Sequence, residues 1–449
     1  YYYTFQYANG SVTISSLKYA NNTSGAWVTT TVDSEGSAGA DNSIAIDKSG
    51  NVYISYSGPK YTTNASGSWV TTTVDTSGKY TSIALDASGN VHISYYDWGG
   101  GDLKYATNAS GSWVTTTVDS SGDVGENTSI ALDKSGNVHI SYEDETNGAL
   151  KYATNASGKW AKKTIDSNVL SVMETSIALD TSVNVYIAYH AYGPESLKYA
   201  NNASGKWVVK TIDSDDAGYS CSIALDTSRK AHISYFDEAV NLKYATDASG
   251  NWVTKTLDST SSGNYAGDDT SIALDTSGNV HISYRDYDSY DSLDNPDEDL
   301  KYVTNASGSW VTTTVAREGA AGADNSIAID KSGNVHICYS YYYSSTSNYG
   351  FLVYATNSTQ SSATPTPMPS PTPTQSCLSD GDVNEDGKLT AKDALLAFEY
   401  VLGKLPLITS CQLTHADVNG NGKVTAADAL CIFKAVLNGL SPSETLSCE

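Results

Sequence analysis

Arginine, phenylalanine and methionine are scarce in this chain of 449 residues, which contains three arginines, five phenylalanines and two methionines. Basic residues number 26 against 50 acidic ones, and the resulting net charge of −24 would repel nucleic acids and anionic membranes. No apolar run approaches the length that spans a bilayer, and nothing at the start reads as a signal peptide. The chain begins with Tyr1 rather than methionine, so we expect a processed, mature form with no nucleic-acid partner and no membrane insertion.

One block of residues recurs seven times, with a period of 42 to 47 residues except for a last step of 58. Its clearest copy combines Leu-Lys-Tyr-Ala (103–106), Asn-Ala-Ser-Gly-Ser-Trp-Val-Thr-Thr-Thr-Val (108–118), Ser-Ile-Ala-Leu-Asp (129–133) and Asn-Val-His-Ile-Ser-Tyr (137–142). Each copy has a tryptophan in the same place: Trp27, Trp69, Trp113, Trp160, Trp207, Trp252 and Trp310. Four short alternating runs at this period predict an all-β fold, a seven-bladed β-propeller with four-stranded blades over residues 1–356.

Two polar positions recur within the block. An aspartate follows the Ser-Ile-Ala run in all seven copies, and capping of the next turn explains it better than catalysis. A histidine occupies one position in five copies, namely His92, His139, His232, His281 and His336, while Tyr53 and Tyr186 replace it in the other two. Because it alternates with tyrosine, we interpret this histidine as a packing element between blades rather than a metal ligand.

The Leu-Lys-Tyr-Ala run occurs eight times, once more than the other runs. The last copy lacks a Thr-rich strand, which residues 27–31 supply, so either residues 16–20 or residues 351–356 are left over. A hairpin over residues 3–15, turning at Asn9-Gly10, has no counterpart in the repeat. A spare strand beside a sheet edge can join subunits by strand addition. The alternatives are an extra strand on the same blade or an eighth, degenerate blade.

The variable loops are expected on one face of the ring, where binding sites usually lie. Trp98, Tyr287 and the tyrosines at 341–343 can stack there on sugar rings or pack against a neighbouring subunit. The loop from Arg285 to Asp299 is rich in acids, but its spacing matches no metal site, so we interpret it as a solvated loop.

The turn before each tryptophan carries Asn-X-Ser/Thr in six copies, and Asp247 replaces the asparagine in the seventh. We expect a secreted surface with N-glycosylation at Asn22, Asn64, Asn108, Asn155, Asn202 and Asn305. The turn chemistry of Asn-Ala-Ser-Gly alone is the other explanation.

The His-Ile-Ser-Tyr and Leu-Lys-Tyr-Ala runs resemble those of Tyr-rich propellers in secreted microbial proteins, and the repeat is distantly similar to sialidase and fucose-lectin propellers over residues 16–356. This resemblance implies the fold. Sialidase-like catalysis needs an arginine cluster for the substrate carboxylate. Arg229 and Arg285 are expected on opposite faces, and Arg317 ends a Thr-rich strand, so we expect a non-catalytic ring.

Alternating proline and threonine mark residues 357–376 as an extended linker. Residues 377–449 then contain a duplicated loop with oxygen-bearing side chains at positions 1, 3, 5, 9 and 12 and glycine at position 6, a pattern that suits Ca²⁺. The expected ligands are Asp382, Asn384, Asp386, Lys388 (through its carbonyl), Thr390 and Asp393, and in the second loop Asp417, Asn419, Asn421, Lys423 (carbonyl), Thr425 and Asp428. Each loop leads into one helix, at residues 394–402 and 429–437, so the module is expected to be all-α.

This duplicated loop–helix pattern resembles a type I-like dockerin. The resemblance implies two bound Ca²⁺ ions and a cohesin-bearing protein as partner, although the module can instead dock onto its own or a neighbouring propeller. Four cysteines in the module, Cys377, Cys411, Cys431 and Cys448, predict two disulfides, with Cys377–Cys448 and Cys411–Cys431 favoured among three possible pairings. Cys221 and Cys338 of the ring are expected to be unpaired.

The sequence thus predicts a non-catalytic extracellular glycoprotein of the cell surface. It would assemble with other copies of itself into a fibre, sheath or scaffold through strand addition and a Ca²⁺-dependent dockerin contact. The alternative is a carbohydrate-binding propeller that binds glycans and is recruited to a cellulosome-like complex by dockerin–cohesin binding. A glycan-cleaving enzyme ranks third, and a paired-carboxylate cleft on the variable-loop face would favour it.

Overall fold

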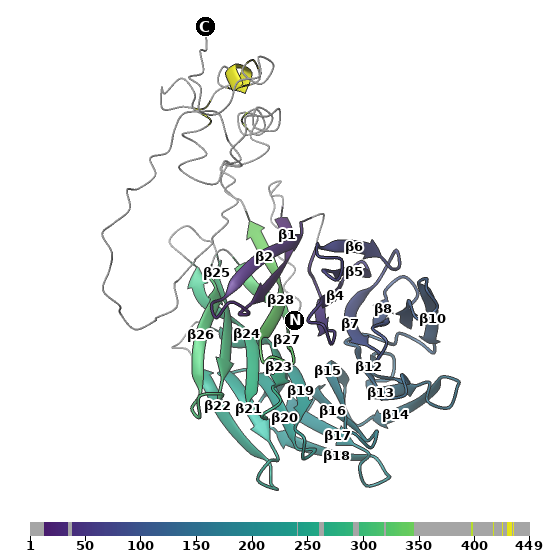
Figure 1. The fold of residues 1–449 in the computed structure, drawn as a ribbon. Coiled ribbons are helices and arrows are strands. Elements are labelled where there is room, and N and C mark those ends of the chain that lie inside the picture. Colours follow the sequence, from purple (N-terminus) through teal and green to yellow (C-terminus); the bar gives the residue numbers. More distant parts are fainter. Residues whose placement is uncertain are drawn as a thin grey trace. The chain divides into compact units, whose positions relative to one another are not determined.

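The computed structural model describes residues 13–34, 38–239, 241–259, 265–290, 296–317 and 320–344, together with 397, 416, 424, 429–432 and 434. The chain divides into two units, Tyr1–Tyr349 with Thr356–Ser358, and Gly350–Ala355 with Thr359–Glu449. The described residues of the first unit contain 28 strands, which form seven four-stranded blades around a ring (Figure 1). Among the described residues, no helix is long and apolar enough to cross a membrane.

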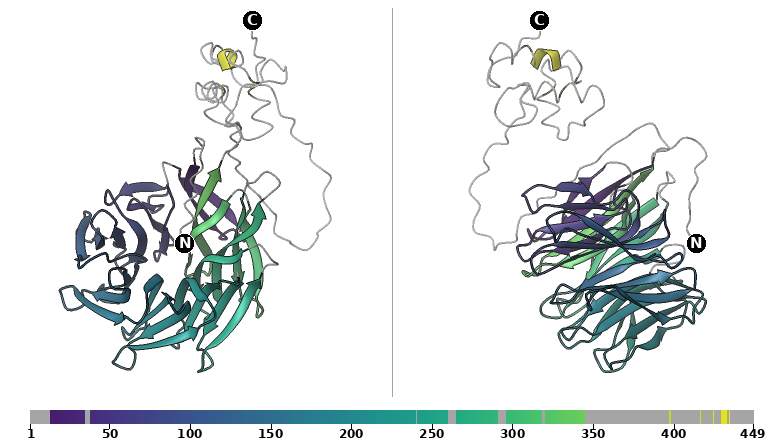
Figure 2. Two further views of the ribbon diagram at one scale, coloured as in Figure 1. Left: turned by 180° about the vertical axis from the view of Figure 1, so that it is seen from behind. Right: turned by 90° about the vertical axis from the view of Figure 1, so that its right-hand side faces the viewer.

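Each blade has four antiparallel strands, which we number first to fourth from the inside of the ring outward (Figures 1 and 2). The first strands are β3 (Ser43–Ile46), β7 (Lys79–Leu85), β11 (Ser129–Leu132), β15 (Ser171–Leu179), β19 (Ala217–Leu225), β23 (Tyr265–Leu274) and β27 (Ala320–Ile329). The second strands are β4 (Val52–Tyr56), β8 (Val91–Asp97), β12 (Val138–Asp144), β16 (Val185–Tyr192), β20 (Ala231–Asp237), β24 (Val280–Tyr290) and β28 (Val335–Ser344).

The outer half of each blade follows the same order. The third strands are β5 (Lys60–Thr63), β9 (Asp102–Thr107), β13 (Ala149–Thr154), β17 (Ser196–Asn201), β21 (Asn241–Thr246), β25 (Pro296–Thr304) and β1 (Thr13–Asn21). The fourth strands are β6 (Val70–Thr73), β10 (Val114–Asp119), β14 (Ala161–Asp166), β18 (Val208–Asp213), β22 (Val253–Ser259), β26 (Val311–Ala316) and β2 (Val28–Asp33). Blades 1 to 6 run from β3–β6 to β23–β26, and blade 7 contains β27, β28, β1 and β2.

Burial follows the position of the strand in the blade. The second strands β8 and β12 are buried along their whole length, because other strands and neighbouring blades cover both of their faces. The fourth strands are mostly exposed, and their Val-Thr-Thr-Thr runs suit a solvated β-surface. The apolar strands thus lie inside each blade and the Thr-rich strands at the rim.

The N-terminal segment closes the ring by completing the last blade. Strand β1 pairs with β28 on one side and with β2 on the other, so the N-terminus supplies both outer strands of blade 7. Of the two candidates for a spare strand, residues 16–20 are therefore used inside the ring, and residues 351–356 lie outside the described residues. Thr13–Ser15, at the end of the hairpin expected over residues 3–15, continue β1 and pair with Ser344–Tyr342. Residues 3–12 lie outside the described residues, so the hairpin stays a prediction. The ring has seven blades rather than eight.

A tyrosine–tryptophan contact joins each blade to the next. The tyrosine of each third strand lies against the tryptophan that precedes the fourth strand of the following blade, with ring centroids 5.0 to 5.5 Å apart. Tyr61–Trp113 joins blades 1 and 2, and Tyr19–Trp69 continues the series across the closure. Since every blade needs this contact, the tryptophan recurs in every copy of the repeat.

The recurrent aspartates cap turns, as the sequence predicts, whereas the recurrent histidines differ from the prediction in the bond that they make. Asp86 accepts hydrogen bonds from the backbone N–H groups of Ser88 and Asn90, at 2.8 and 2.9 Å, and so caps the turn between the first and second strands. His92 lies 2.5 Å from the Tyr105 hydroxyl through Nδ1, and its Nε2 lies 3.6 Å from Asp86. The histidine bonds within its own blade rather than between blades, and the tyrosine then makes the contact with the next blade.

Candidate functional site

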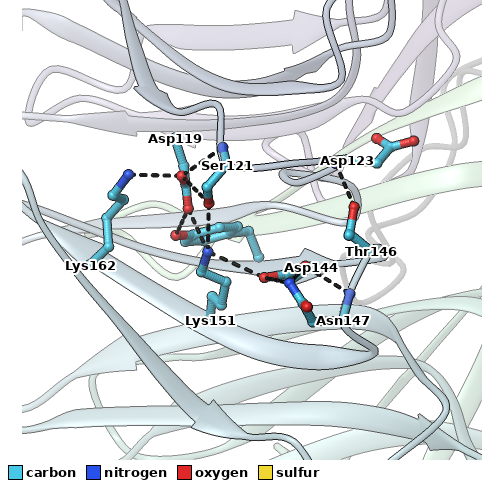
Figure 3. Close-up of polar contacts among 9 residues, drawn as sticks. Asp119, Ser121, Asp123, Asp144, Thr146, Asn147, Lys151 and Lys162 are labelled. Atoms are coloured by element: carbon cyan, nitrogen blue, oxygen red, sulfur yellow. Dashed lines mark hydrogen bonds and ion pairs between the residues drawn. The ribbon is translucent and has the colours of Figure 1, made fainter.

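A polar junction links neighbouring blades on the face that carries the variable loops. At the junction of blades 2 and 3, Asp119 at the end of β10 accepts hydrogen bonds from the Tyr142 hydroxyl at 2.8 Å and from Lys151 Nζ at 2.7 Å (Figure 3). Lys162 adds a further contact of 2.8 Å, and Lys151 also lies 3.2 Å from Asp144. Burial opposes the charge of Asp119, but the hydrogen bonds from Lys151 and Lys162 outweigh it and hold the pKa of this carboxyl below its usual range.

The same junction recurs around the ring and is therefore structural. In five other blades the second-strand tyrosine donates to the aspartate that ends the fourth strand of the preceding blade, as Tyr56–Asp33, Tyr95–Asp75, Tyr189–Asp166, Tyr235–Asp213 and Tyr284–Asp258. A group that recurs at six of the seven junctions, with Ala316 in place of the aspartate at the seventh, does not distinguish one blade as a binding site.

Seven residues in the left-handed backbone region surround the inside of the ring on this face. Each stands two residues before a Ser-Ile-Ala run, with φ between 44° and 52°: Asp41, Tyr80, Asn127, Glu174, Ser220, Asp269 and Asp324. Their carbonyls accept hydrogen bonds from the next blade, for example from the Thr81 hydroxyl to Asp41 at 2.9 Å. The backbone is thus constant here while the side chains vary. Sequence reasoning missed this set, although the variability of that one position was a visible signal.

Two of these side chains, Asp41 and Asp324, form a pair of carboxyls between blades 7 and 1. Burial and the neighbouring Asp41 raise the pKa of Asp324 to about 6, while Arg285 acts in the opposite direction. Arg285 itself lies 3.4 Å from Asp269 and 3.9 Å from Glu298. Arg229 instead lies 3.6 Å from Asp180, the aspartate that caps a turn on the opposite face. The two arginines do not converge, as the sequence predicts.

A second group of carboxyls lies at the junction of blades 2 and 3. Burial, followed by the charges of Glu145, Glu143 and Asp123, raises the pKa of Glu126 to about 7. Glu143 is buried and accepts hydrogen bonds from the Ser171 hydroxyl and, at 3.1 Å, from the Asn127 amide. Glu126 is half-buried and Glu145 is exposed. The junction therefore presents a carboxyl with a pKa near neutral, and burial also raises the pKa values of the neighbouring Glu143 and Glu145.

An exposed tryptophan stands beside this acidic group. The Trp98 side chain is 63% exposed, in the turn between β8 and β9. Asp97 fixes that turn, because its carbonyl accepts from the N–H groups of Gly100 and Gly101 and its side chain accepts from the Ser77 hydroxyl at 2.6 Å.

Asp123 connects the tryptophan turn to the acids of blade 3. It accepts a hydrogen bond from the Tyr96 hydroxyl at 2.7 Å, and a Cβ added at Gly101 would lie 3.2 Å from its carboxylate. Its backbone carbonyl accepts from Glu145 N–H at 3.0 Å, and its own N–H donates to the Thr146 hydroxyl at 2.7 Å (Figure 3). We call Trp98, Gly99–Gly101, Asp102, Asp123, Glu126 and Glu145 the Trp98 site.

The other aromatic residues expected to stack on sugars are less accessible. Tyr287 lies half-buried in β24, where it pairs with Tyr265 of β23. Tyr341 is half-buried in β28, with the Lys18 ammonium 4.9 Å from its ring centroid. The side chains at 342 and 343 lie outside the described residues. Trp98 is therefore the aromatic residue of that set that the described structure presents to solvent.

The asparagines predicted to be glycosylated have a structural role. Asn108 Oδ1 accepts a hydrogen bond of 2.8 Å from the N–H of Val91, which begins the buried second strand. The same bond occurs at the other five: Asn22, Asn64, Asn155, Asn202 and Asn305. Asp247 makes it too, accepting from Ala231 N–H at 2.9 Å. Turn chemistry thus accounts for the recurrence, and glycosylation stays a prediction.

The predicted calcium ligands of residues 382–393 and 417–428 lie outside the described residues. Their donor set consists of carboxylate, amide, hydroxyl and carbonyl oxygens, which fits Ca²⁺. Cys431 is disulfide-bonded, and the pairing of the module's cysteines stays a prediction. Cys221 and Cys338 are free and buried, so the expectation that they are unpaired is confirmed.

Residues 380–437 match the model of the dockerin type I domain. No curated protein shows a significant match to the chain. Solved structures with a similar fold include AofleA from Arthrobotrys oligospora (15% identity, 67% of this chain and 89% of that one, TM-score 0.43) and the fucose-specific lectin of Aleuria aurantia (13%, 57% and 86%, 0.40). A polysaccharide lyase, PL25 ulvan lyase, is also similar (14%, 65% and 89%, 0.45). These TM-scores lie below 0.5, so the matches say nothing about what this chain binds or catalyses.

Proposed function

We propose that this chain is a carbohydrate-binding propeller that its dockerin attaches to a cohesin-bearing protein outside the cell. The observation that carries the binding role is Trp98, an exposed indole in a turn held by hydrogen bonds. Sugars stack on aromatic rings through their C–H faces, and carboxylates such as Asp102 and Asp123 accept hydrogen bonds from sugar hydroxyls. Gly99–Gly101 add no side chains, so a flat ring can approach the indole.

Glycan binding by the full chain and by Trp98→Ala tests this role. We expect the wild type to retain a subset of a glycan array and Trp98→Ala to lose it, because the stacking surface is removed. Leu170→Ala is the matched control, since Leu170 is another large apolar side chain exposed on this face, at 72%. Absence of selective binding by the wild type, or equal binding by Trp98→Ala, would refute the proposal.

The attachment role rests on the dockerin type I match at residues 380–437. Type I dockerins bind calcium, and we propose two ions held by the twelve ligands predicted above. Calcium would order the loops by drawing their oxygen ligands together. Retention on an immobilised cohesin in Ca²⁺, with release by EGTA, tests this contact. Retention that persists in EGTA would contradict it.

Glycan cleavage at the same site is the second candidate, because Glu126 has a pKa of about 7 and has the carboxyls of Glu145, Glu143 and Asp123 as neighbours. A protonated carboxyl can donate a proton to a leaving sugar oxygen while a second carboxylate acts as base or nucleophile. Reducing-end release from a bound glycan, abolished in Glu126→Gln with binding retained, would establish it. Binding without release would assign the site to recognition alone.

Fibre formation by strand addition is less favoured by the geometry than the sequence suggests. Strand β1 is paired along both edges within its own ring, so the N-terminal candidate is not available as a donor. The remaining candidate is residues 351–356. If the full chain forms polymers that persist in EGTA and disappear when residues 351–356 are deleted, strand addition is restored as the mode of assembly.

A further inference from the structure

The outer strands of three adjacent blades carry lysines that the other four lack. Between the third-strand end and the end of the fourth strand, blades 3 to 5 contain Lys159, Lys162, Lys163, Lys206, Lys210 and Lys255. The corresponding stretches of blades 6, 7, 1 and 2 contain no lysine or arginine. Blades 6, 7, 1 and 2 thus serve as an internal comparison for blades 3 to 5, because the strands and turns are the same in both sets of blades.

Three of these lysines occupy one register position. Lys163, Lys210 and Lys255 stand opposite the third-strand tyrosines Tyr152, Tyr199 and Tyr244. The residues opposite the corresponding tyrosines of the other blades are Thr72, Thr116, Thr313 and Thr30. The fold therefore accepts threonine at this position, and lysine is not needed to form the strand.

The row is exposed and mostly unpaired. The first four residues of β14, β18 and β22 are all exposed. Lys162 pairs with Asp119, and the Lys255 ammonium lies 5.6 Å from the Trp310 ring centroid. Lys159, Lys163, Lys206 and Lys210 have no ion-pair partner among the described residues.

Protection of sheet edges does not account for this distribution. Edge strands often carry lysine to prevent pairing with other chains. That need would be greatest at the Val-Thr-Thr-Thr edges of blades 1, 2, 6 and 7, which are uncharged and rich in β-branched residues, yet those edges have no lysine. The lysines are concentrated on one sector of the rim for another reason.

We propose that this lysine row binds a chain of acidic polysaccharide, carboxylated or sulfated, at a site separate from the Trp98 site. The row lies on the outer, convex edge of a closed ring and extends over three of seven blades. A flexible polyanion can follow such an edge from blade to blade, whereas a folded partner would meet a curved surface without a continuous apolar centre. The net charge of −24 does not prevent this, because screening at physiological salt leaves the local lysines dominant within about 8 Å.

The test compares two triple variants of the full chain for binding to polygalacturonate at 0.15 M salt. Lys163→Thr/Lys210→Thr/Lys255→Thr gives these blades the residue found in the other four, so folding is preserved. We expect about tenfold weaker binding and a smaller salt dependence, as for three lost exposed ion pairs. The control Lys48→Thr/Lys134→Thr/Lys331→Thr removes the same charge from exposed turns in which other copies have Thr181, Thr227 and Thr276, and we expect it to bind as the wild type does.

Three outcomes would overturn the proposal. In the first, the wild type binds neither polygalacturonate nor a sulfated glycan. In the second, both triple variants bind more weakly by the same factor. In the third, the wild type binds a single-stranded polynucleotide as well as it binds polygalacturonate, and the Lys163→Thr/Lys210→Thr/Lys255→Thr variant loses that binding. The last would mean that the row recognises any polyanion. Trp98→Ala should leave polygalacturonate binding intact, which separates this site from that of the proposed function.

Discussion

Glu126→Gln should make the stability of the propeller less sensitive to pH. Burial and the acids Glu145, Glu143 and Asp123 raise the pKa of Glu126 from 4.5 to about 7. For an acid whose pKa is raised on folding, stability is full below pH 4.5 and is lost as the pH rises through 7. At about 1.36 kcal/mol per pH unit the loss cannot exceed about 3.4 kcal/mol, and solvent screening of this half-exposed group reduces it to roughly 1–2 kcal/mol.

The variant should therefore be more stable than the wild type by roughly 1–2 kcal/mol at pH 8, and by only about a quarter of that at pH 5, where the loss has just begun. Urea unfolding followed by tryptophan fluorescence at both pH values measures the difference. Glu238→Gln, at an exposed position in the loop between β20 and β21 of blade 5, is the control for removal of an acidic side chain from this face. A difference between Glu126→Gln and wild type that is the same at pH 5 and pH 8 would refute the assignment.

Three further predictions concern the repeat and the module. Val183→Gly should stabilise the propeller by about 1 kcal/mol in urea unfolding, because Val183 has φ 65° where five other copies have glycine; an unchanged midpoint would mean that the turn is not strained. Asn108→Ala should destabilise the propeller by about 1–2 kcal/mol, because it leaves the Val91 N–H unpaired. Asn108→Asp should leave the stability unchanged, because Asp247 makes the same hydrogen bond in blade 5. Equal destabilisation by both variants would point instead to a lost glycan, which mass spectrometry would show. EGTA should lower the thermal midpoint of the dockerin transition and leave that of the propeller unchanged, and a shift of both in calorimetry would contradict calcium binding confined to the module.

The sequence predicted the ring well because seven copies allow each position to be compared with itself. The exchange of His92 and its equivalents for tyrosine identified a structural position, but it did not reveal that the histidine bonds within its own blade, to the hydroxyl of Tyr105. The sequence left open whether residues 16–20 or residues 351–356 form the third strand of the last blade. Both segments match that strand, and the way the ring closes decides which of them is used. Only the pairing of β1 with β28 settles which segment is used.

The Trp98 site was predictable only in part. Trp98 was proposed as a stacking residue from its place in a variable loop. Glu126 was missed because its high pKa depends on Asp123 of its own loop and on Glu143 and Glu145 of blade 3, which the fold brings close to that loop. No local pattern in the sequence encodes that proximity, since the residues are ordinary polar loop residues.

The symmetry of the ring separates structure from function in this chain. A group that closes the ring, such as the Tyr61–Trp113 contact, is needed at every junction and therefore recurs. A group that appears in one blade, such as Trp98, or in one sector, such as the row from Lys163 to Lys255, is not required by closure, because the other blades fold without it. Each such departure also carries a cost, as an indole exposed to water or a concentration of like charge. A ligand bound over the indole and a second ligand bound along the lysines would each remove one of these costs, which is our reason for proposing a binding site at each departure.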